Sequence, residues 1–581
     1  MSVGLFATAD TESSVAASTA PLVGVRSASR LRHRLALVAV CLLGVALVSR
    51  GIRDEGAGSL DGDMPRYLMN GAFLYDLIGD APVRAPLAYA QQYYARYPAL
   101  SLGHHPFMPA LAEAPFFFIF GVSVFSARLT TVCAFALLLV FWFRLIREIY
   151  DAPTAMFASL LLISTPGMIP LFQVVLSEPY TLCLIVLSAY FMHRYCVTER
   201  TGAAIAFAIC VVLSAYAKQL AVFIFPVYLF QFVSAFGVRR LFRRSTLVTI
   251  AVIGCCLLPL VPLTLKYSHW NVKIVTQFVI PGDRTSRERL LRFARGFWAG
   301  QFRLSVPVVV LSGIALTGAA LSKDRRILLF AIWAASVFVG LMLLGMPKSR
   351  FSCYWLPAFC ALAASTVQLR SAPRWRAAWA LILIATVGYQ FWIGTRDAAT
   401  LTAGEIRPAG ATGYEEAARY VSDYRQGDTV LYSAAIDTGY FVFFVRKNDP
   451  EHKMIVLRAD KILTTSLMGN ANFKREINER AEILPLLQRY GVGYVVIEDH
   501  PYPDGPLRWL QQIVESESFE LRRRIPIESS DLRLKHATLS IYEYKGRVPA
   551  ARDAALSLGV PLMNGIIHVP LADLIEGPRR R

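Results

Sequence analysis

Charge is scarce in this sequence, and cysteine is absent after residue 360. Charged residues make up 17% of the 581 positions and hydrophobic residues 55%, with a mean hydropathy of +0.44. Soluble globular chains carry about 25% charged residues, so the composition predicts an integral membrane protein. The nine cysteines lie within or beside apolar runs, which indicates buried apolar side chains instead of disulfides or metal ligands. They are Cys41, Cys133, Cys183, Cys196, Cys210, Cys255, Cys256, Cys353 and Cys360.

The tail of the chain lacks both membrane spans and the usual motifs of soluble enzymes. After about residue 396 no apolar run approaches the ~20 residues that a bilayer requires. The tail also has no glycine-rich phosphate loop, Cys/His metal spacing or nucleophile elbow. Its residue patterns predict helices and short strands in alternation, and therefore an α/β domain that packs or docks an acceptor without chemistry of its own. The expected helices cover 414–421 and 477–490, and the expected strands 428–433, 441–445, 454–457 and 494–498.

Long apolar runs fill the chain between residues 34 and 396. Most are near the ~20 residues of a membrane-crossing helix, so the sequence predicts a polytopic α-helical membrane protein with about eleven spans. The expected spans are 34–50, 125–146, 153–173, 179–195, 203–217, 219–236, 246–265, 304–322, 327–346, 353–369 and 377–395.

Basic residues, which give the chain a net charge of +19, cluster in roughly every second loop. Such loops are cytoplasmic by the positive-inside rule, and their arginines form no basic patch for nucleic acid. The Ser/Ala/Thr-rich residues 1–33 are then a disordered cytoplasmic tail. Residues 34–396 form the transmembrane domain of a multi-pass inner (plasma) membrane protein. Residues 397–581 form a periplasmic or extracellular domain.

One apolar run, 106–121, is too short to be a span and contains Glu113 between two prolines. A run of this length is more typical of a helix at the membrane surface. Counting it as a crossing would also place the later arginine clusters outside. We therefore expect juxtamembrane helices in the first outer loop.

Acidic and basic side chains follow the predicted outer ends of several spans. Charges beside hydrocarbon are costly unless they face water or a partner, so these residues are candidates for a functional site. The positive-inside rule disfavours basic residues on the outer side, so their presence there requires an explanation other than topology. The acidic candidates are Asp61, Asp63 and Glu178, and the basic candidates are Lys218, Lys348 and Arg350.

The order of several motifs resembles one family, the polytopic GT-C glycosyltransferases that use polyprenyl-phosphate sugars. This family includes protein O-mannosyltransferases and lipid A aminoarabinose transferases, and the resemblance covers roughly residues 35–400. The motifs that carry it are Asp63-Met-Pro-Arg66-Tyr67, His105-Pro106-Phe107, Phe120-Gly-Val-Ser-Val-Phe-Ser-Ala-Arg128-Leu129, Ser177-Glu178-Pro179 and Ala217-Lys218-Gln219.

The resemblance implies a GT-C fold and a role for each candidate. Asp63 would be the catalytic base and Glu178 the second acidic residue. Met64 stands where the family has Glu, and Asp61 lies two residues before Asp63, so Asp61 is an alternative base. The remaining residues would bind substrate: Arg66, Tyr67, His105, Lys218, Lys348, Arg350 and Tyr354.

The implied reaction transfers one sugar, with inversion, from a polyprenyl-phosphate donor to an extracytoplasmic hydroxyl of a protein, lipid A or envelope glycan. No cofactor is expected, since the sequence has no dedicated His/Asp ligand cluster, although a divalent metal stays open. A transporter or flippase of lipid-linked sugars is the main alternative, but it predicts polar residues near mid-membrane and repeated halves. A membrane-tethered binding module is a third reading.

Overall fold

The computed structural model describes most of the chain, and its Cα positions divide into two compact units. The bundle unit contains 1–50, 131–173 and 177–401, and the loop-and-tail unit contains 51–130, 174–176 and 402–581. The described residues are 22–54, 63–101, 107–262, 300, 302–322, 324–343, 349–368, 373–398, 411–423, 429–434, 438–465, 474–500, 502, 505–529, 534, 536–551, 553–560 and 565–575.

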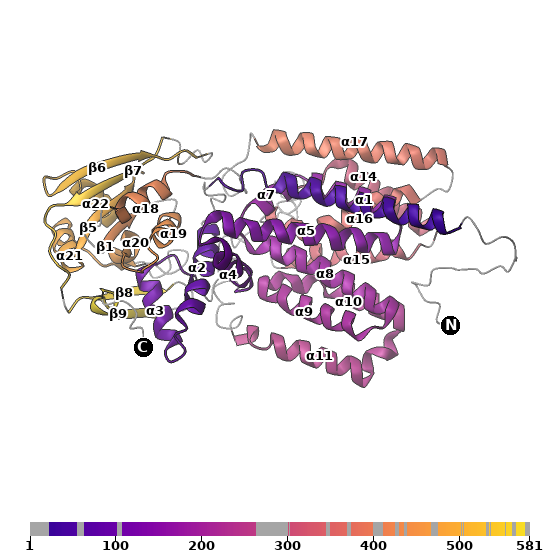
Figure 1. Cartoon of the computed structure of the whole chain (residues 1–581), viewed down its shortest axis with the longest axis horizontal. Helices are drawn as coiled ribbons and strands as arrows, with labels where there is room; N and C mark the ends of the chain where they lie inside the picture. The colour runs from indigo at the N-terminus through magenta and orange to yellow at the C-terminus, as the bar shows by residue number, and fades with distance from the viewer. Residues whose placement is uncertain are drawn as a thin grey trace, which may run out of the picture. The chain divides into compact units, whose positions relative to one another are not determined.

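The bundle unit consists of helices that lie roughly parallel to one another (Figure 1). Five helical segments in the described residues are long and apolar enough to cross a membrane, judged by length and composition: Leu31–Val48, Val124–Ile149, Ser177–Thr198, Gln219–Phe236 and Pro373–Arg396. The bundle elements are α1 (Leu22–Val48), α5 (Val124–Ile149), α6 (Ala152–Ser164), α7 (Met168–Gln173), α8 (Ser177–Thr198), α9 (Thr201–Ala217), η1 (Gln219–Ile224), α10 (Phe225–Phe236), η2 (Val238–Phe242), α11 (Arg244–Leu257), α14 (Val306–Ser322), α15 (Arg326–Leu343), η4 (Ser349–Tyr354), α16 (Leu356–Ser365), η5 (Thr366–Gln368) and α17 (Pro373–Ala398).

Every predicted span coincides with at least one of these helices, although several described helices are shorter than the ~20 residues of a full crossing. The predicted span 153–173 is interrupted after α6, at Thr165-Pro166-Gly167, and resumes as α7. Proline disfavours the helical conformation of the residue before it, and Gly167 has φ +82°, which favours glycine. The predicted span 246–265 begins as α11, and its end lies outside the described residues.

The predicted disordered tail, residues 1–33, is too long at its C-terminal end. Helix α1 begins at Leu22, so it extends well before the apolar run. Extending an existing helix by one residue costs little compared with nucleating it, and Leu, Ala and Arg are good helix formers. Residues 1–21 lie outside the described residues.

In the loop-and-tail unit, the segment after the first span folds into α2 (Met64–Asp80), α3 (Pro86–Arg96) and α4 (Met108–Phe120). The predicted juxtamembrane run thus forms a helix of 13 residues, which is too short to span. Its buried face packs on α2, where Gly71 lets Glu113 approach the backbone. Proline occupies the first or second position of each of these helices, as its fixed φ and missing N–H allow.

The tail forms a mixed sheet with strand order β2-β1-β5-β7-β6. β1 pairs parallel with β2 and β5, while β7 pairs antiparallel with β5 and β6. The three parallel strands are buried along their whole length, as parallel strands covered on both faces usually are. The sheet strands are β1 (Thr429–Ser433), β2 (Ile455–Arg458), β5 (Val492–Glu498), β6 (Phe519–Pro526) and β7 (Thr538–Tyr544).

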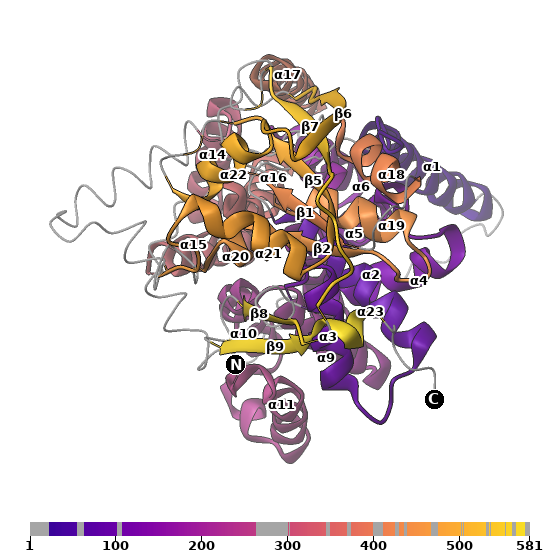
Figure 2. The ribbon, with the colours of Figure 1, turned by 90° about the vertical axis from the view of Figure 1, so that its left-hand side faces the viewer.

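The predicted α/β tail is therefore present, and three of its four predicted strands, β1, β2 and β5, are in the sheet. A separate hairpin, β8–β9, lies beside α3 (Figure 2). The remaining tail elements are α18 (Tyr414–Asp423), α19 (Tyr440–Asn448), α20 (Ala459–Ile462), β3 (Thr464–Thr465), β4 (Lys474–Arg475), η7 (Arg480–Glu482), α21 (Ile483–Arg489), α22 (Pro506–Ile513), β8 (Ala555–Val560), β9 (Gly565–Pro570) and α23 (Leu571–Ile575).

The fourth predicted strand, 441–445, is wrong, because these residues form part of helix α19. A short run of aromatic and β-branched residues cannot be assigned to strand or helix by periodicity alone. Here residues 440–446 are all buried, so the helix needs apolar side chains on every face. The antiparallel strands β6 and β7 were not predicted, and the predicted helix 477–490 is limited to η7 and α21.

The predicted domain boundary at residue 396/397 also differs from the division into compact units. Residues 51–130 were assigned to the transmembrane domain, whereas they group with the tail. Contacts such as those between α3 and β2 and between α19 and α2 account for this grouping.

Candidate functional site

Within the bundle unit, Glu178 lies in the first turn of α8, where a carboxylate interacts favourably with the helix dipole. Its side chain is 1% exposed. Ser177 Oγ donates a hydrogen bond to Glu178 Oε2 at 3.2 Å. A buried carboxylate requires opposite charge and hydrogen bonds to offset its lost hydration.

Two cations supply that charge. Lys218, which follows the last residue of α9 in an extended conformation, places Nζ 2.7 Å from Glu178 Oε1 and 3.4 Å from Ser177 Oγ. Arg350, in the 3₁₀ turn η4, places Nε 3.0 Å from the same Oε1 atom. The structure therefore brings together three predicted site residues that come from separate parts of the sequence.

One aromatic ring completes this cluster. Lys218 Nζ lies 4.4 Å and Arg350 Cζ 5.5 Å from the centroid of the Phe351 ring. Contacts of this kind orient cations through the electron-rich ring face. Neither Phe351 nor Ser177 was predicted as a site residue, although each is adjacent in sequence to one that was.

The cluster carries one negative and two positive charges, with part of each cation at the surface. The side chains of Lys218 and Arg350 are 18% and 10% exposed. These three side chains place two cations beside one buried carboxylate at the ends of the helices. Such an arrangement can bind and neutralise a phosphate group.

Tyr354 lies at the end of the same 3₁₀ turn and is buried. Its backbone carbonyl accepts a hydrogen bond of 2.8 Å from Trp333 Nε1 of α15. This contact fixes the end of the segment that carries Arg350.

In the loop-and-tail unit, Asp63, Arg66 and Tyr67 share the first turns of α2. Asp63 is the N-cap residue, and its carbonyl oxygen accepts the backbone N–H groups of Arg66 and Tyr67, both at 3.1 Å. Asp63 and Arg66 are partly exposed and Tyr67 is buried. Burial lowers the pKa of Arg66, Asp63 raises it, and Arg458 of the tail lowers it further, which leaves it below its usual value.

Three predicted site residues lie outside the described residues: Asp61, His105 and Lys348. Within the described ranges, no group of three or more His, Cys, Asp or Glu side chains is arranged to hold a metal ion.

Solved structures provide two informative likenesses. ArnT from Cupriavidus metallidurans, bound to undecaprenyl phosphate, has a TM-score of 0.56 at 14% identity over 87% of this chain and 97% of ArnT. An oligosaccharyltransferase from Archaeoglobus fulgidus, in complex with Zn and sulfate, has a TM-score of 0.52 at 15% identity over 80% of this chain and 68% of its own. The chain thus has the fold of the GT-C glycosyltransferases.

A family model described as dolichyl-phosphate-mannose-protein mannosyltransferase matches residues 104–265. The chain is thus similar in fold to ArnT, and residues 104–265 match this mannosyltransferase family model. No curated protein sequence matches the chain.

Proposed function

We propose that this protein is an integral membrane glycosyltransferase that transfers one sugar from a polyprenyl-phosphate donor to an extracytoplasmic hydroxyl group. The observation that carries the proposal is the cluster of Glu178, Lys218 and Arg350 at helix ends within a GT-C fold. The N-terminus is cytoplasmic and the tail domain extracytoplasmic in this proposal, because the arginine-rich loops then lie inside.

In the proposed reaction, Lys218 and Arg350 bind the phosphate of the donor. As the bond between the anomeric carbon and the phosphate oxygen breaks, that oxygen takes the electron pair and gains charge. Fixed cations that stabilise such developing charge commonly contribute about 10²–10³ in rate. Glu178 acts in this scheme by holding both cations in place, since its Oε1 atom contacts each of them.

Asp63 is the proposed base. It takes the proton of the acceptor hydroxyl while the acceptor oxygen forms a bond to the anomeric carbon, and polyprenyl phosphate leaves from the opposite face with inversion. The support is its place in the motif Asp63-Met-Pro-Arg66-Tyr67, directly before α2. Asp61 remains the alternative base.

The proposed step requires no metal ion, because two protein cations neutralise the leaving phosphate. Chelation with EDTA should therefore leave turnover within about twofold of the untreated enzyme. A large loss that added Mg²⁺ or Mn²⁺ restores would contradict this part of the proposal.

The test is sugar transfer by the purified protein from a radiolabelled panel of polyprenyl-phosphate sugars to a mixed envelope extract. Asp63→Asn and Asp61→Asn are compared with Glu451→Gln, whose side chain is 62% exposed. Turnover that falls roughly 100-fold or more in Asp63→Asn alone supports the proposal, and the consumed donor identifies the sugar. A loss confined to Asp61→Asn assigns the base to Asp61. Labelled lipid that crosses liposomes without being consumed contradicts a transferase and indicates a transporter.

A further inference from the structure

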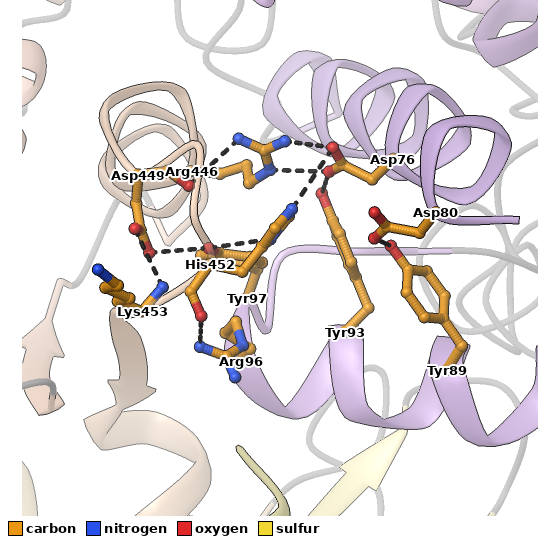
Figure 3. Close-up of polar contacts among 10 residues, drawn as sticks. All are labelled: Asp76, Asp80, Tyr89, Tyr93, Arg96, Tyr97, Arg446, Asp449, His452 and Lys453. Carbon is orange, nitrogen blue, oxygen red and sulfur yellow. Dashed lines mark hydrogen bonds and ion pairs between the residues drawn. The ribbon is translucent and has the colours of Figure 1, made fainter. Parts of the chain in front are cut away.

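A buried ionic network joins the tail domain to the helices of the first loop, and all its members belong to the loop-and-tail unit (Figure 3). At its centre, Asp76 of α2 and Arg446 of α19 form an ion pair in which both side chains are 4% exposed. Arg446 Nε donates to Asp76 Oδ2 at 2.8 Å, and Arg446 Nη2 donates to Asp76 Oδ1. The pair is therefore bidentate, which fixes orientation as well as distance.

Further hydrogen bonds satisfy the remaining polar atoms of this pair. Tyr93 of α3 donates its hydroxyl to Asp76 Oδ2 at 2.7 Å, and His452 Nε2 lies 3.6 Å from Asp76 Oδ1. Arg96 of α3 donates to the carbonyl oxygens of His452 and Leu574. Three elements of the loop and tail thus meet at one carboxylate.

Asp449, just after α19, forms the second centre of the network and is fully buried. Its carboxylate accepts hydrogen bonds from Tyr97 Oη at 3.1 Å and from the backbone N–H groups of Lys453 and Met454 at 3.0 and 2.6 Å. A buried charge that is fully hydrogen-bonded holds one arrangement of its partners strongly, because losing a partner leaves an uncompensated charge.

The tail contacts α2 near its other end as well. Gly439, which precedes α19, lies so close to Pro65 that a Cβ atom on it would be 2.8 Å from the proline ring. Pro65 is two residues after Asp63. Helix α19 therefore holds α2 at Pro65 and at Asp76, about 16 Å apart along the helix axis.

We propose that α19 of the tail domain positions α2, so that Arg446 and Gly439 are positioning residues for Asp63 and Arg66. The inference rests on the proposed function of Asp63 as the base. In it the tail is an integral part of the catalytic unit, because α19 adds buried contacts at both ends of the helix that carries the base.

The test compares Arg446→Met and Gly439→Ala with two controls in the full-length protein. Arg419→Met removes an arginine of the tail that is 62% exposed, and Gly79→Ala adds a methyl group to α2 where nothing lies within 4 Å. We expect kcat to fall at least tenfold in both positioning variants and in neither control. The affinity for undecaprenyl phosphate should stay within about twofold, because Lys218 and Arg350 belong to the bundle unit.

Arg446→Lys, which keeps the charge but not the bidentate geometry, should retain more activity than Arg446→Met. Unchanged kcat in both positioning variants would overturn the inference. A parallel loss of kcat and of affinity for undecaprenyl phosphate would also overturn the inference, since that result indicates general unfolding.

A second readout does not depend on turnover and so separates this inference from the proposed function. Amide hydrogen exchange should become faster in α2 of Arg446→Met and Gly439→Ala, with exchange in α8 and α9 unchanged. If wild type transfers no sugar, the proposed function fails, whereas the exchange pattern still tests whether α19 holds α2. Exchange of α2 that is unaffected by either substitution contradicts the inference whatever the activity.

Discussion

Lys218 Nζ lies 2.7 Å from Glu178 Oε1, although the two residues are 40 positions apart in the chain. The contact joins the end of α9 to the beginning of α8, and Arg350 approaches the same oxygen atom from a third segment. One buried carboxylate therefore determines where two cations lie.

Replacing Glu178 by Gln should destabilise the bundle by about 3–5 kcal/mol, because two partly buried cations would then lose the carboxylate that both of them contact. The measurement is the thermal unfolding midpoint in detergent. Glu199→Gln is the matched control, since Glu199 pairs with Arg240 at the surface with 55% exposure, and exposed pairs contribute about 0–1 kcal/mol. Equal midpoints for Glu178→Gln and Glu199→Gln would contradict this reading.

Lys218→Met and Arg350→Met should each lower kcat by about 10²–10³, because in the proposed reaction each removes a cation that neutralises the leaving phosphate. Affinity for undecaprenyl phosphate should fall in the same variants, as measured by titration with the labelled lipid. Lys453→Gln serves as the control, because its side chain is 57% exposed. Lipid affinity that is unchanged in both cation variants would remove them from the donor site.

Gly71→Ala should destabilise the packing of α2 on α4, because the added methyl group would overlap the Glu113 carboxyl group. Overpacking of this kind typically costs about 1–3 kcal/mol. Glu113→Ala should reduce the effect in a double-mutant cycle, since it removes the carboxyl oxygen that would lie 2.2 Å from the added carbon. Additive effects of the two substitutions would show that the residues do not interact, and Gly79→Ala on the same helix should be silent.

The stability of the loop-and-tail unit should depend on pH through Asp76. Burial raises the pKa of Asp76, but the His452 hydrogen bond and the Arg446 charge outweigh it, so the pKa lies below its ordinary value. The carboxylate is thus favoured in the folded state. Its contribution is complete above the ordinary pKa of about 3.9 and is lost as the pH falls towards the lower folded value.

Asp76→Asn should remove that part of the acid sensitivity. Unfolding midpoints measured from pH 7 to pH 3 should decrease less steeply for the variant than for wild type, while the variant is less stable at pH 7. An identical slope for both proteins would mean that Asp76 is not a source of the pH dependence.

Several features of the fold could be predicted because they depend on the local order of apolar and polar residues in the sequence. Among the described residues, long apolar runs located the α-helices of the bundle, and two prolines near Glu113 indicated a short helix. The run at 441–445 was assigned to a strand because its residue types favour one, but complete burial lets the same residues form helix α19. Strands β6 and β7 pair across a long connection, and their register follows from cross-strand packing that is not visible in the sequence.

For the site, topology and motif order alone indicated that Glu178, Lys218 and Arg350 belong together, because the predicted directions of the spans place their ends on one face. The sequence by itself therefore determined the membrane class, the apolar bundle helices and the choice of Glu178, Lys218 and Arg350 as candidate site residues. Only the tertiary structure decided that Glu178 contacts both cations through one oxygen, and that Asp76 pairs with Arg446, 370 positions away. A buried charge is stable only beside a partner that compensates it. Which residues lie close enough to be that partner depends on how the whole chain packs.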